Sequence, residues 1–187
     1  MTLIDFDLFS KIQLEDLLKV GWTPGSPTSP SLLQFIKYYN HIHYLFKFLI
    51  LSEINTQKRT KLVKKVIELG EQFVLLNNFN GLEQITSVLQ HKSISKLNKV
   101  FSTLPSRYTD SLNKLIQLAD STNNFSKLRH MYSSSEPPSV PYLAIYLTDL
   151  WCTDMSLSDG NSEGINLNKL LKLSDILYDL RVSQQTG

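Results

Sequence analysis

Cysteine is almost absent from this sequence, because only Cys152 occurs in 187 residues. A single thiol excludes an internal disulfide framework and a zinc site built from cysteine thiolates. An excess of one charge is lacking too, since 19 basic and 17 acidic residues leave a net charge of +2. That balance argues against nucleic acid or an anionic membrane as the main partner.

Long hydrophobic runs are missing as well. The most apolar window, residues 44–51, is interrupted by Lys47 and is too short to span a bilayer. Asp5 and Asp7 stand where a secretory signal needs basic and then apolar residues. We therefore expect a soluble protein of a reducing compartment that does not insert directly into membranes.

Apolar residues recur at helical spacing in several segments. The clearest stripe consists of Leu62, Val66, Leu69, Phe73 and Leu76. Its opposite face carries Lys58, Lys61, Lys64, Lys65 and Glu68, which we interpret as a solvated helix face rather than a nucleic-acid patch. Two similar patterns are formed by Leu112, Leu115, Ile116 and Ala119, and by Leu167, Leu170, Ser174, Leu177 and Leu180.

Prolines and polar stretches mark the limits of these helices. The prolines and glycine of 24–30 predict an exposed connector, and Ser29-Pro30 predicts a helix over about 30–51. Pro105 predicts another helix start, the prolines of 137–141 interrupt any helix, and 156–164 is a polar loop. Since no stretch alternates at period two over strand length, we expect one all-α domain of about eight or nine helices.

Sequence motifs for covalent or metal chemistry are lacking. The chain has no phosphate-binding glycine loop, no G-x-S-x-G elbow and no H-E-x-x-H helix, so we expect no nucleotide site, metal or cofactor. His41 and His43 would point about 200° apart on a helix, so we interpret them as packing residues rather than metal ligands. Cys152 has no base beside it in sequence, and we expect an inert, partly buried side chain rather than a nucleophile.

One segment, 137–150, reads PPSVPYLAIYLTDL and resembles the signature of the Ras guanine-nucleotide exchange factor (RasGEF) catalytic domain. In that family the pattern P-P-x-V-P-[YF]-x-G-x-Y-L-T-[DN] opens a helical hairpin. Further matches follow the family's order along the chain: LNNFN at 76–80, LPSR at 104–107, NF at 124–125, DGN at 159–161 and INLNK at 165–169. The resemblance therefore covers the whole chain and rests on a long, specific motif.

The resemblance implies a compact, all-α RasGEF catalytic domain over 1–187, with a protruding helical hairpin over about 141–184. It implies a factor that accelerates GDP release from a Ras-family small GTPase without covalent chemistry. Such a factor prefers the nucleotide-free GTPase, and by linkage that preference equals the nucleotide affinity that the GTPase loses. We expect a cytoplasmic monomer, placed in the host cytosol if the protein is a microbial effector.

The resemblance also implies a site for the switch 2 segment of the GTPase, anchored by a tyrosine of the GTPase in a hydrophobic pocket. Carried over position by position, the pocket and its rim comprise Lys37, Gln90, Phe125 and Tyr142. Aromatic rings are common hot spots of interfaces. Without the motif we would interpret Phe125 and Tyr142 as core residues, and the motif favours the interface.

The hairpin is expected to comprise a helix over about 141–154 and a return helix over about 165–184, with a tip that displaces switch 1. The residues that the resemblance makes catalytic are Thr148 and Asp149 on the motif, Trp151 at the position that crowds magnesium, and Asp159. Asp159 matches an acid that competes for the phosphate-binding lysine of the GTPase. Because the segment between Asp149 and Asp159 is longer than the family spacing, Asp154 remains a rival for that role.

Three substitutions depart from the family pattern. Lys37 replaces an arginine, Ala144 replaces the signature glycine, and Glu83 stands where the pocket has an aliphatic side chain. Glu83 and the longer hairpin loop favour an alternative, a helical GTPase-binding or protein-interaction module that releases no nucleotide. A supporting helical domain often precedes this one in the family, so we expect either that it was trimmed away or that the protein works without it.

Overall fold

The computed structural model describes residues 1–18, 29–157, 159–161 and 164–185, which form eleven helices and one pair of short strands. The body contains α1 (Thr2–Ser10), α2 (Leu14–Leu18), α3 (Pro30–Ser52), α4 (Thr56–Leu75), α5 (Phe79–Gln90), α6 (Lys92–Ser95), α7 (Asn98–Phe101), α8 (Ser106–Leu118) and α9 (Thr122–Ser133). The C-terminal part contains α10 (Leu143–Ser156), β1 (Gly160–Asn161), β2 (Gly164–Ile165) and α11 (Leu167–Ser183). The all-α fold class is confirmed, and the helix count exceeds the expected eight or nine because α2, α6 and α7 are only four or five residues long.

The predicted helix limits agree with the structure to within two residues. The third helix begins at Pro30, as the Ser29-Pro30 pair predicts, and α8 begins directly after Pro105. The two hairpin helices each begin two residues later than expected. The connector expected over 24–30 lies largely outside the described residues, and the loop expected over 156–164 contains β1, which pairs antiparallel with β2.

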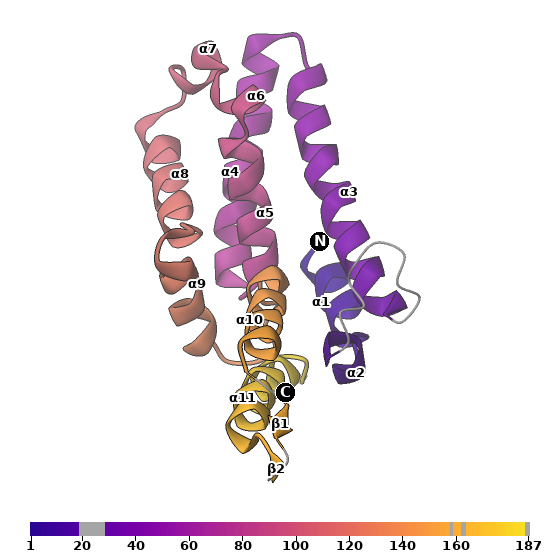
Figure 1. The fold of residues 1–187 in the computed structure, drawn as a ribbon. Helices are drawn as coiled ribbons and strands as arrows, with labels where there is room; N and C mark the ends of the chain where they lie inside the picture. The colour runs from indigo at the N-terminus through magenta and orange to yellow at the C-terminus, as the bar shows by residue number, and fades with distance from the viewer. Residues whose placement is uncertain (19–28, 158, 162–163, 186–187) are drawn as a thin grey trace.

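α5 is the central helix of the body. It packs against α3, α4 and α8, as Figure 1 shows, and nine of its twelve residues are buried. A Cβ atom at Gly81 would lie 2.8 Å from the ring of Phe73, so only glycine allows α4 and α5 to approach this closely. The glycine that follows the LNNFN element is therefore needed for packing.

The stripe predicted on α4 is only partly the buried face. Of its five members, Val66 and Phe73 are buried, whereas Leu76 is 54% exposed. The buried residues of the helix are Thr60, Val63, Val66, Ile67, Gly70 and Phe73. The contact face is rotated from the predicted stripe because α5, α7 and α8 all pack against α4.

The lysine-rich face of α4 is also less solvated than predicted. Lys58, Lys61 and Lys65 are exposed, as expected. Lys64, however, is half-buried, and its ammonium lies 5.3 Å from the centre of the Tyr108 ring. Residues of α8 therefore cover part of this face.

Backbone hydrogen bonds join two segments that lie 60 residues apart in the sequence. The amide of Phe79 donates to the carbonyl of Val140 (2.8 Å), and the amide of Val140 donates to the carbonyl of Asn77 (2.9 Å). The Asn78 side chain caps α5 by accepting a hydrogen bond from the amide of Gly81 (2.8 Å). These bonds fix the start of α10 relative to the central helix.

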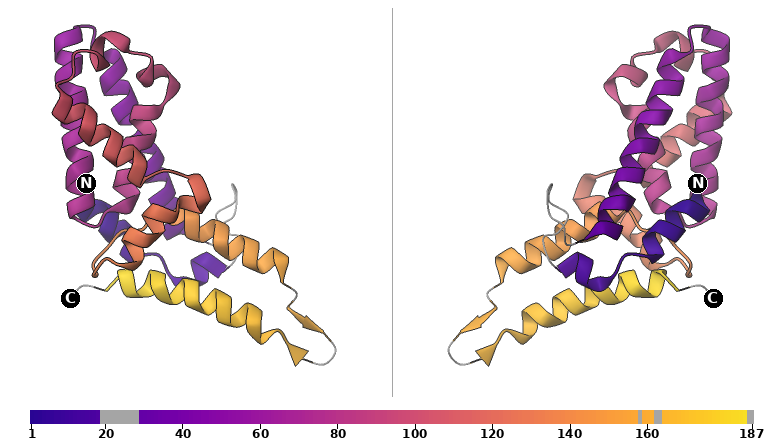
Figure 2. Two further views of the ribbon diagram at one scale, coloured as in Figure 1. Left: turned by 90° about the vertical axis from the view of Figure 1, so that its left-hand side faces the viewer. Right: turned by 90° about the vertical axis from the view of Figure 1, so that its right-hand side faces the viewer.

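The last two helices form a hairpin that projects from the body, with β1 and β2 at its far end (Figure 2). Leu180, near the base, is buried, but Leu167 is 70% exposed. The apolar stripe predicted over 167–180 is thus a core stripe only near its C-terminal end. The reason is that only the base of the hairpin meets the helical body, as Figure 2 shows.

Candidate functional site

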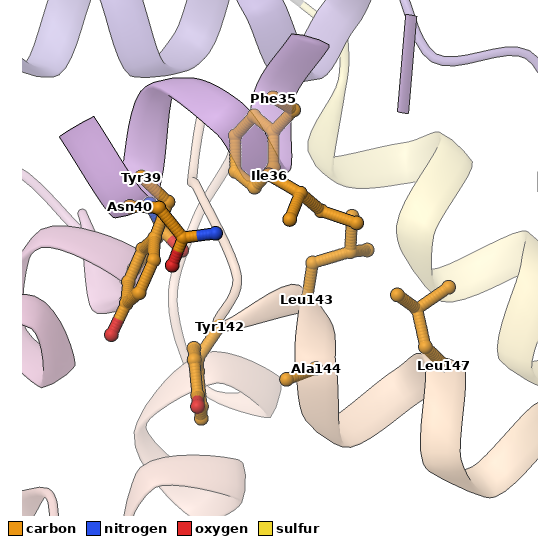
Figure 3. A pocket seen from close by; sticks show the side chains of 9 residues that line it. Phe35, Ile36, Tyr39, Asn40, Tyr142, Leu143, Ala144 and Leu147 are labelled. Atoms are coloured by element: carbon orange, nitrogen blue, oxygen red, sulfur yellow. The ribbon is translucent and has the colours of Figure 1, made fainter. Parts of the chain in front are cut away.

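A pocket of about 220 Å³ lies between α3 and the start of α10 (Figure 3). Its lining is mainly apolar and includes Phe35, Ile36 and Tyr39 from α3 and Tyr142, Leu143 and Leu147 from the α10 segment. Tyr39 and Tyr142 both lie toward the same end of the pocket, as Figure 3 shows. A pocket of this composition suits an apolar or aromatic side chain of a partner.

Three aromatic rings meet at that end. The ring of Tyr142 lies 6.3 Å from that of Tyr39 and 5.7 Å from that of Phe125, the latter pair edge to face. Phe125 and Tyr142, the two aromatic residues that the sequence predicted, are half-buried, so each packs on the protein and still offers surface to a partner. Burial raises the pKa of Tyr142 to about 12, because a charged phenolate is disfavoured away from water.

The backbone around Phe125 has an unusual conformation. Asn123, Asn124 and Phe125 have φ values of 50°, 54° and 57°, in the left-handed region that residues with side chains seldom adopt. The guanidinium of Arg129 donates from Nε to the carbonyl of Asn124 (2.8 Å). Arg129 therefore supports the strained turn that presents the Phe125 ring.

Tyr39 was missed by the sequence interpretation, although it occupies the pocket. Its hydroxyl donates a hydrogen bond to the Glu83 carboxylate, and its carbonyl accepts one from Gln84 Nε2 (2.7 Å). Burial raises the pKa of Glu83 above its ordinary value, because a charged carboxylate is disfavoured away from water. The available signal was spacing, since Tyr39 lies three residues after Ile36 on one helix face.

The two predicted rim residues lie away from the pocket lining. Lys37 is exposed and lines a second, open hollow with Ile4, Leu8 and His41. Gln90 is exposed at the end of α5, two turns beyond Glu83. The structure thus brings together Phe125 and Tyr142, but not Lys37 and Gln90.

Two predicted hairpin residues make contacts within the protein. The hydroxyl of Thr148 donates to the carbonyl of Ala144 one turn earlier (2.8 Å), and the residue is exposed. Asp149 forms a two-pronged ion pair with Arg129, with Nη1–Oδ2 and Nη2–Oδ1 distances of 2.6 and 2.9 Å. Asp149 therefore links α10 to α9 through Arg129, the same residue that binds the carbonyl next to Phe125.

The remaining predicted residues lie farther out on the hairpin. Trp151 is 47% exposed on α10. Asp159, and also its rival Asp154, contact the ammonium of Lys169, at 2.5 and 2.7 Å. The resemblance implies a role for one of these two acids, Asp159 or Asp154, and in the structure both form ion pairs with Lys169.

Two minor predictions about single residues need correction. Cys152 was expected to be partly buried, but it is exposed, because its helix is in the part of the hairpin that projects from the body. His43 packs as expected, with its ring stacked on Tyr39 at 6.4 Å, whereas His41 is exposed because its side of α3 meets an open hollow. Within the described ranges, the structure contains no group of three potential metal ligands and no helix of sufficient length and hydropathy to cross a bilayer.

The chain is similar to known proteins over most of its length. The model of the RasGEF domain family matches residues 1–171. A protein named Ras-specific guanine nucleotide-releasing factor 2 from Danio rerio is 30% identical over 189 residues, and Ras guanine nucleotide exchange factor W from Dictyostelium discoideum is 29% identical over 179 residues. These matches cover 100% and 94% of this chain but only 15% of each relative, so the chain spans about a seventh of their length.

Proposed function

The chain belongs to the RasGEF domain family, and we propose that it is a guanine-nucleotide exchange factor that accelerates GDP release from a Ras-family small GTPase. The observation that carries the proposal is the aromatic pocket at the base of a projecting helical hairpin. A partner that fills the pocket is thereby placed against α10, so one GTPase can contact both features.

The pocket anchors the GTPase through switch 2. Tyr39 and Tyr142 present aromatic surface to an apolar hollow, and the Phe125 ring packs on Tyr142; this composition is typical of interface hot spots. Such contacts stabilise every complex with the GTPase, whether or not nucleotide is bound. The pocket therefore supplies affinity rather than exchange.

The hairpin supplies the preference for the nucleotide-free state. Trp151 and the acid Asp159 act where magnesium and phosphate are bound in the loaded GTPase, so their contacts form fully only after both have left. Interactions made only in the released state lower the barrier to release, as differential binding does in catalysis. No covalent bond is made or broken, and Asp149 holds α10 against α9 through Arg129.

A nucleotide-release assay tests the proposal. A panel of Ras-family GTPases is loaded with a fluorescent GDP analogue, and its loss is followed in excess GDP with and without the protein. We expect release from at least one GTPase to be accelerated at least about tenfold, equivalent to about 1.4 kcal/mol of barrier. The proposal fails if no GTPase in the panel responds while the protein is folded and monomeric.

A second candidate is a GTPase-binding module that does not release nucleotide. It is favoured by Glu83, a half-buried carboxylate at the aromatic pocket whose one hydrogen-bond partner in the described structure is Tyr39. An apolar side chain that covers this carboxyl group takes it further out of water, and the cost of that desolvation lowers the affinity. Tight binding to both loaded and nucleotide-free GTPase, without faster release, distinguishes this candidate.

A further inference from the structure

Lys169 holds three oxygen atoms near the tip of the hairpin. Its ammonium contacts the Asp159 carboxylate at 2.5 Å, the Asp154 carboxylate at 2.7 Å and the Asp154 carbonyl at 3.0 Å. We call Asp154, Asp159 and Lys169 the tip cluster. It joins the end of α10, the segment before β1 and the first turn of α11.

The members of the tip cluster differ in their access to solvent. The Lys169 side chain is only 7% exposed, whereas that of Asp154 is 49% and that of Asp159 is 94% exposed. The hydrogen bonds that Lys169 donates to Asp154 and then to Asp159 raise the pKa of Lys169, so the ammonium stays charged. Asp159 is therefore the member that is most accessible to a partner.

The backbone around the cluster holds its geometry. The amide of Asn166 donates to the carbonyl of Asp159 (2.9 Å), and the Asn166 side chain caps α11 by accepting from the amide of Lys169 (3.1 Å). Gly160 pairs with Ile165 in the two-stranded segment. These bonds fix the backbone of Asp159 and of Lys169 relative to each other.

We propose that Lys169 is a positioning residue that holds Asp159 ready for the GTPase, with Asp154 as its permanent partner. Two carboxylates share one ammonium, which leaves one net negative charge at the tip. When Asp159 turns to a lysine of the GTPase, Lys169 keeps the carboxylate and carbonyl of Asp154, so no buried cation is left without a partner. This inference rests on the proposed function, since it concerns the acid of the exchange reaction.

The arrangement assigns different roles to the two rival acids. Asp159 is transferable because it is bound through one carboxylate oxygen and is almost fully exposed. Asp154 is retained because Lys169 binds both its side chain and its backbone. Removing the Asp159 carboxylate should therefore slow nucleotide exchange without making the backbone of the hairpin tip more mobile. Removing the Asp154 carboxylate should make that backbone more mobile.

A double-mutant cycle in the full chain tests the role of Lys169. We expect Asp159→Asn and Lys169→Met each to slow stimulated release about tenfold through kcat, with KM for the GTPase changed less than about twofold. In the Asp159→Asn background, Lys169→Met should cost less than a further twofold or so, because it acts through that acid. Additive losses would overturn the proposal, and so would a loss confined to KM.

A structural readout separates this inference from the proposed function. Amide hydrogen exchange at Asn166 should become faster in Lys169→Met and in Asp154→Asn but stay near wild type in Asp159→Asn and Lys169→Arg. Lys169→Arg, which keeps the charge, should also retain most of the release activity. If no GTPase responds to the wild type, the proposed function fails. In that case, an unchanged rate of amide hydrogen exchange at Asn166 in Lys169→Met would overturn the positioning role as well.

Discussion

Arg129 and Asp149 form a two-pronged ion pair in which both side chains are 27% exposed. The same guanidinium donates to the carbonyl of Asn124, next to Phe125. The planar fork of arginine lets one side chain bind a carboxylate and a carbonyl together. A residue of the hairpin motif is therefore connected, through one arginine, to the turn whose Phe125 ring packs on Tyr142 of the pocket.

Asp149→Ala should weaken both folding and GTPase binding. The change leaves the Arg129 guanidinium without its carboxylate and frees the strained turn at Phe125. Loss of a partly buried charge-assisted pair should lower the unfolding free energy by about 1–3 kcal/mol. Urea denaturation measures this loss, and calorimetric titration with nucleotide-free GTPase should show weaker binding.

Asp7→Ala is the matched control for that experiment. Asp7 pairs with Lys11 at 2.6 Å, but both side chains are more than half exposed. An exposed pair of this kind contributes at most about 0.5 kcal/mol. Equal effects of Asp7→Ala and Asp149→Ala on stability would contradict a special role for the Arg129 pair.

The sequence predicted the fold more completely than the site. Prolines and the Ser29 cap located the starts of α3 and α8 because those signals act locally on the backbone. The family resemblance and the polar loop located α10 and α11. The buried face of α4 was predicted less well, since burial depends on which helices pack around it. Lys64 shows this, because Tyr108 of another helix covers it.

Contacts between distant segments explain what was missed at the site. Phe125 and Tyr142 were predicted because each lies on a recognisable motif. Tyr39 was missed because its partner Glu83 is 44 residues away, and Lys169 because its two acids lie 10 and 15 residues before it. Hydrophobic periodicity in the sequence does not predict such side-chain pairs, because they depend on how the helices and the hairpin pack.

Phe125→Ala should weaken binding to nucleotide-free GTPase while the protein stays folded. Truncation of a hot-spot aromatic residue typically costs about 2–4 kcal/mol, which corresponds to a loss of thirtyfold or more. Part of the ring packs on Tyr142, so a thermal melt must accompany the titration. Binding at the wild-type level would place the interface elsewhere.

Lys65→Ala is the control for the aromatic variant. Lys65 is exposed on α4, so its truncation should change neither binding nor stability. Lys64 is unsuitable because its ammonium lies over the Tyr108 ring. Tyr142→Phe adds a milder test, since it keeps the ring and removes only the hydroxyl.

Asp5 should make the protein more stable in mild acid than at neutral pH. This fully buried carboxyl accepts a hydrogen bond from Asn78 Nδ2 (2.8 Å), and burial raises its pKa to about 6. Between about pH 4 and 6 the folded state therefore binds more protons than the unfolded state, so the contribution of Asp5 to stability falls as pH rises. Two pKa units correspond to about 3 kcal/mol, and this loss is complete above pH 6.

Asp5→Asn isolates that effect. Because the amide carries no charge, the difference in unfolding free energy between mutant and wild type should grow in favour of the mutant from about pH 4 to 7. Urea denaturation at a series of pH values measures it, with Asp7→Ala as the exposed control. A constant difference across this range would mean that Asp5 titrates alike in the folded and unfolded states.

Trp151→Ala should slow nucleotide release, and magnesium should control the size of the defect. Trp151 is 47% exposed on α10, so its ring is available to a partner without being a core residue. If its indole excludes magnesium from the GTPase, chelation of the ion removes the step that the side chain assists. We expect release in magnesium to slow about tenfold, or about 1.4 kcal/mol, and the defect to shrink to less than about threefold in excess EDTA.

Met155→Ala controls for the loss of apolar surface alone. Met155 lies one helical turn beyond Trp151 and is 68% exposed, so its truncation removes comparable exposed surface from the same helix. It should change release little under either condition, because a general apolar contact does not depend on magnesium. If the two variants show equal defects that EDTA does not alter, the hairpin contributes affinity rather than magnesium exclusion. Since that contribution would be the same for loaded and empty GTPase, it would favour the binding module over the exchange factor.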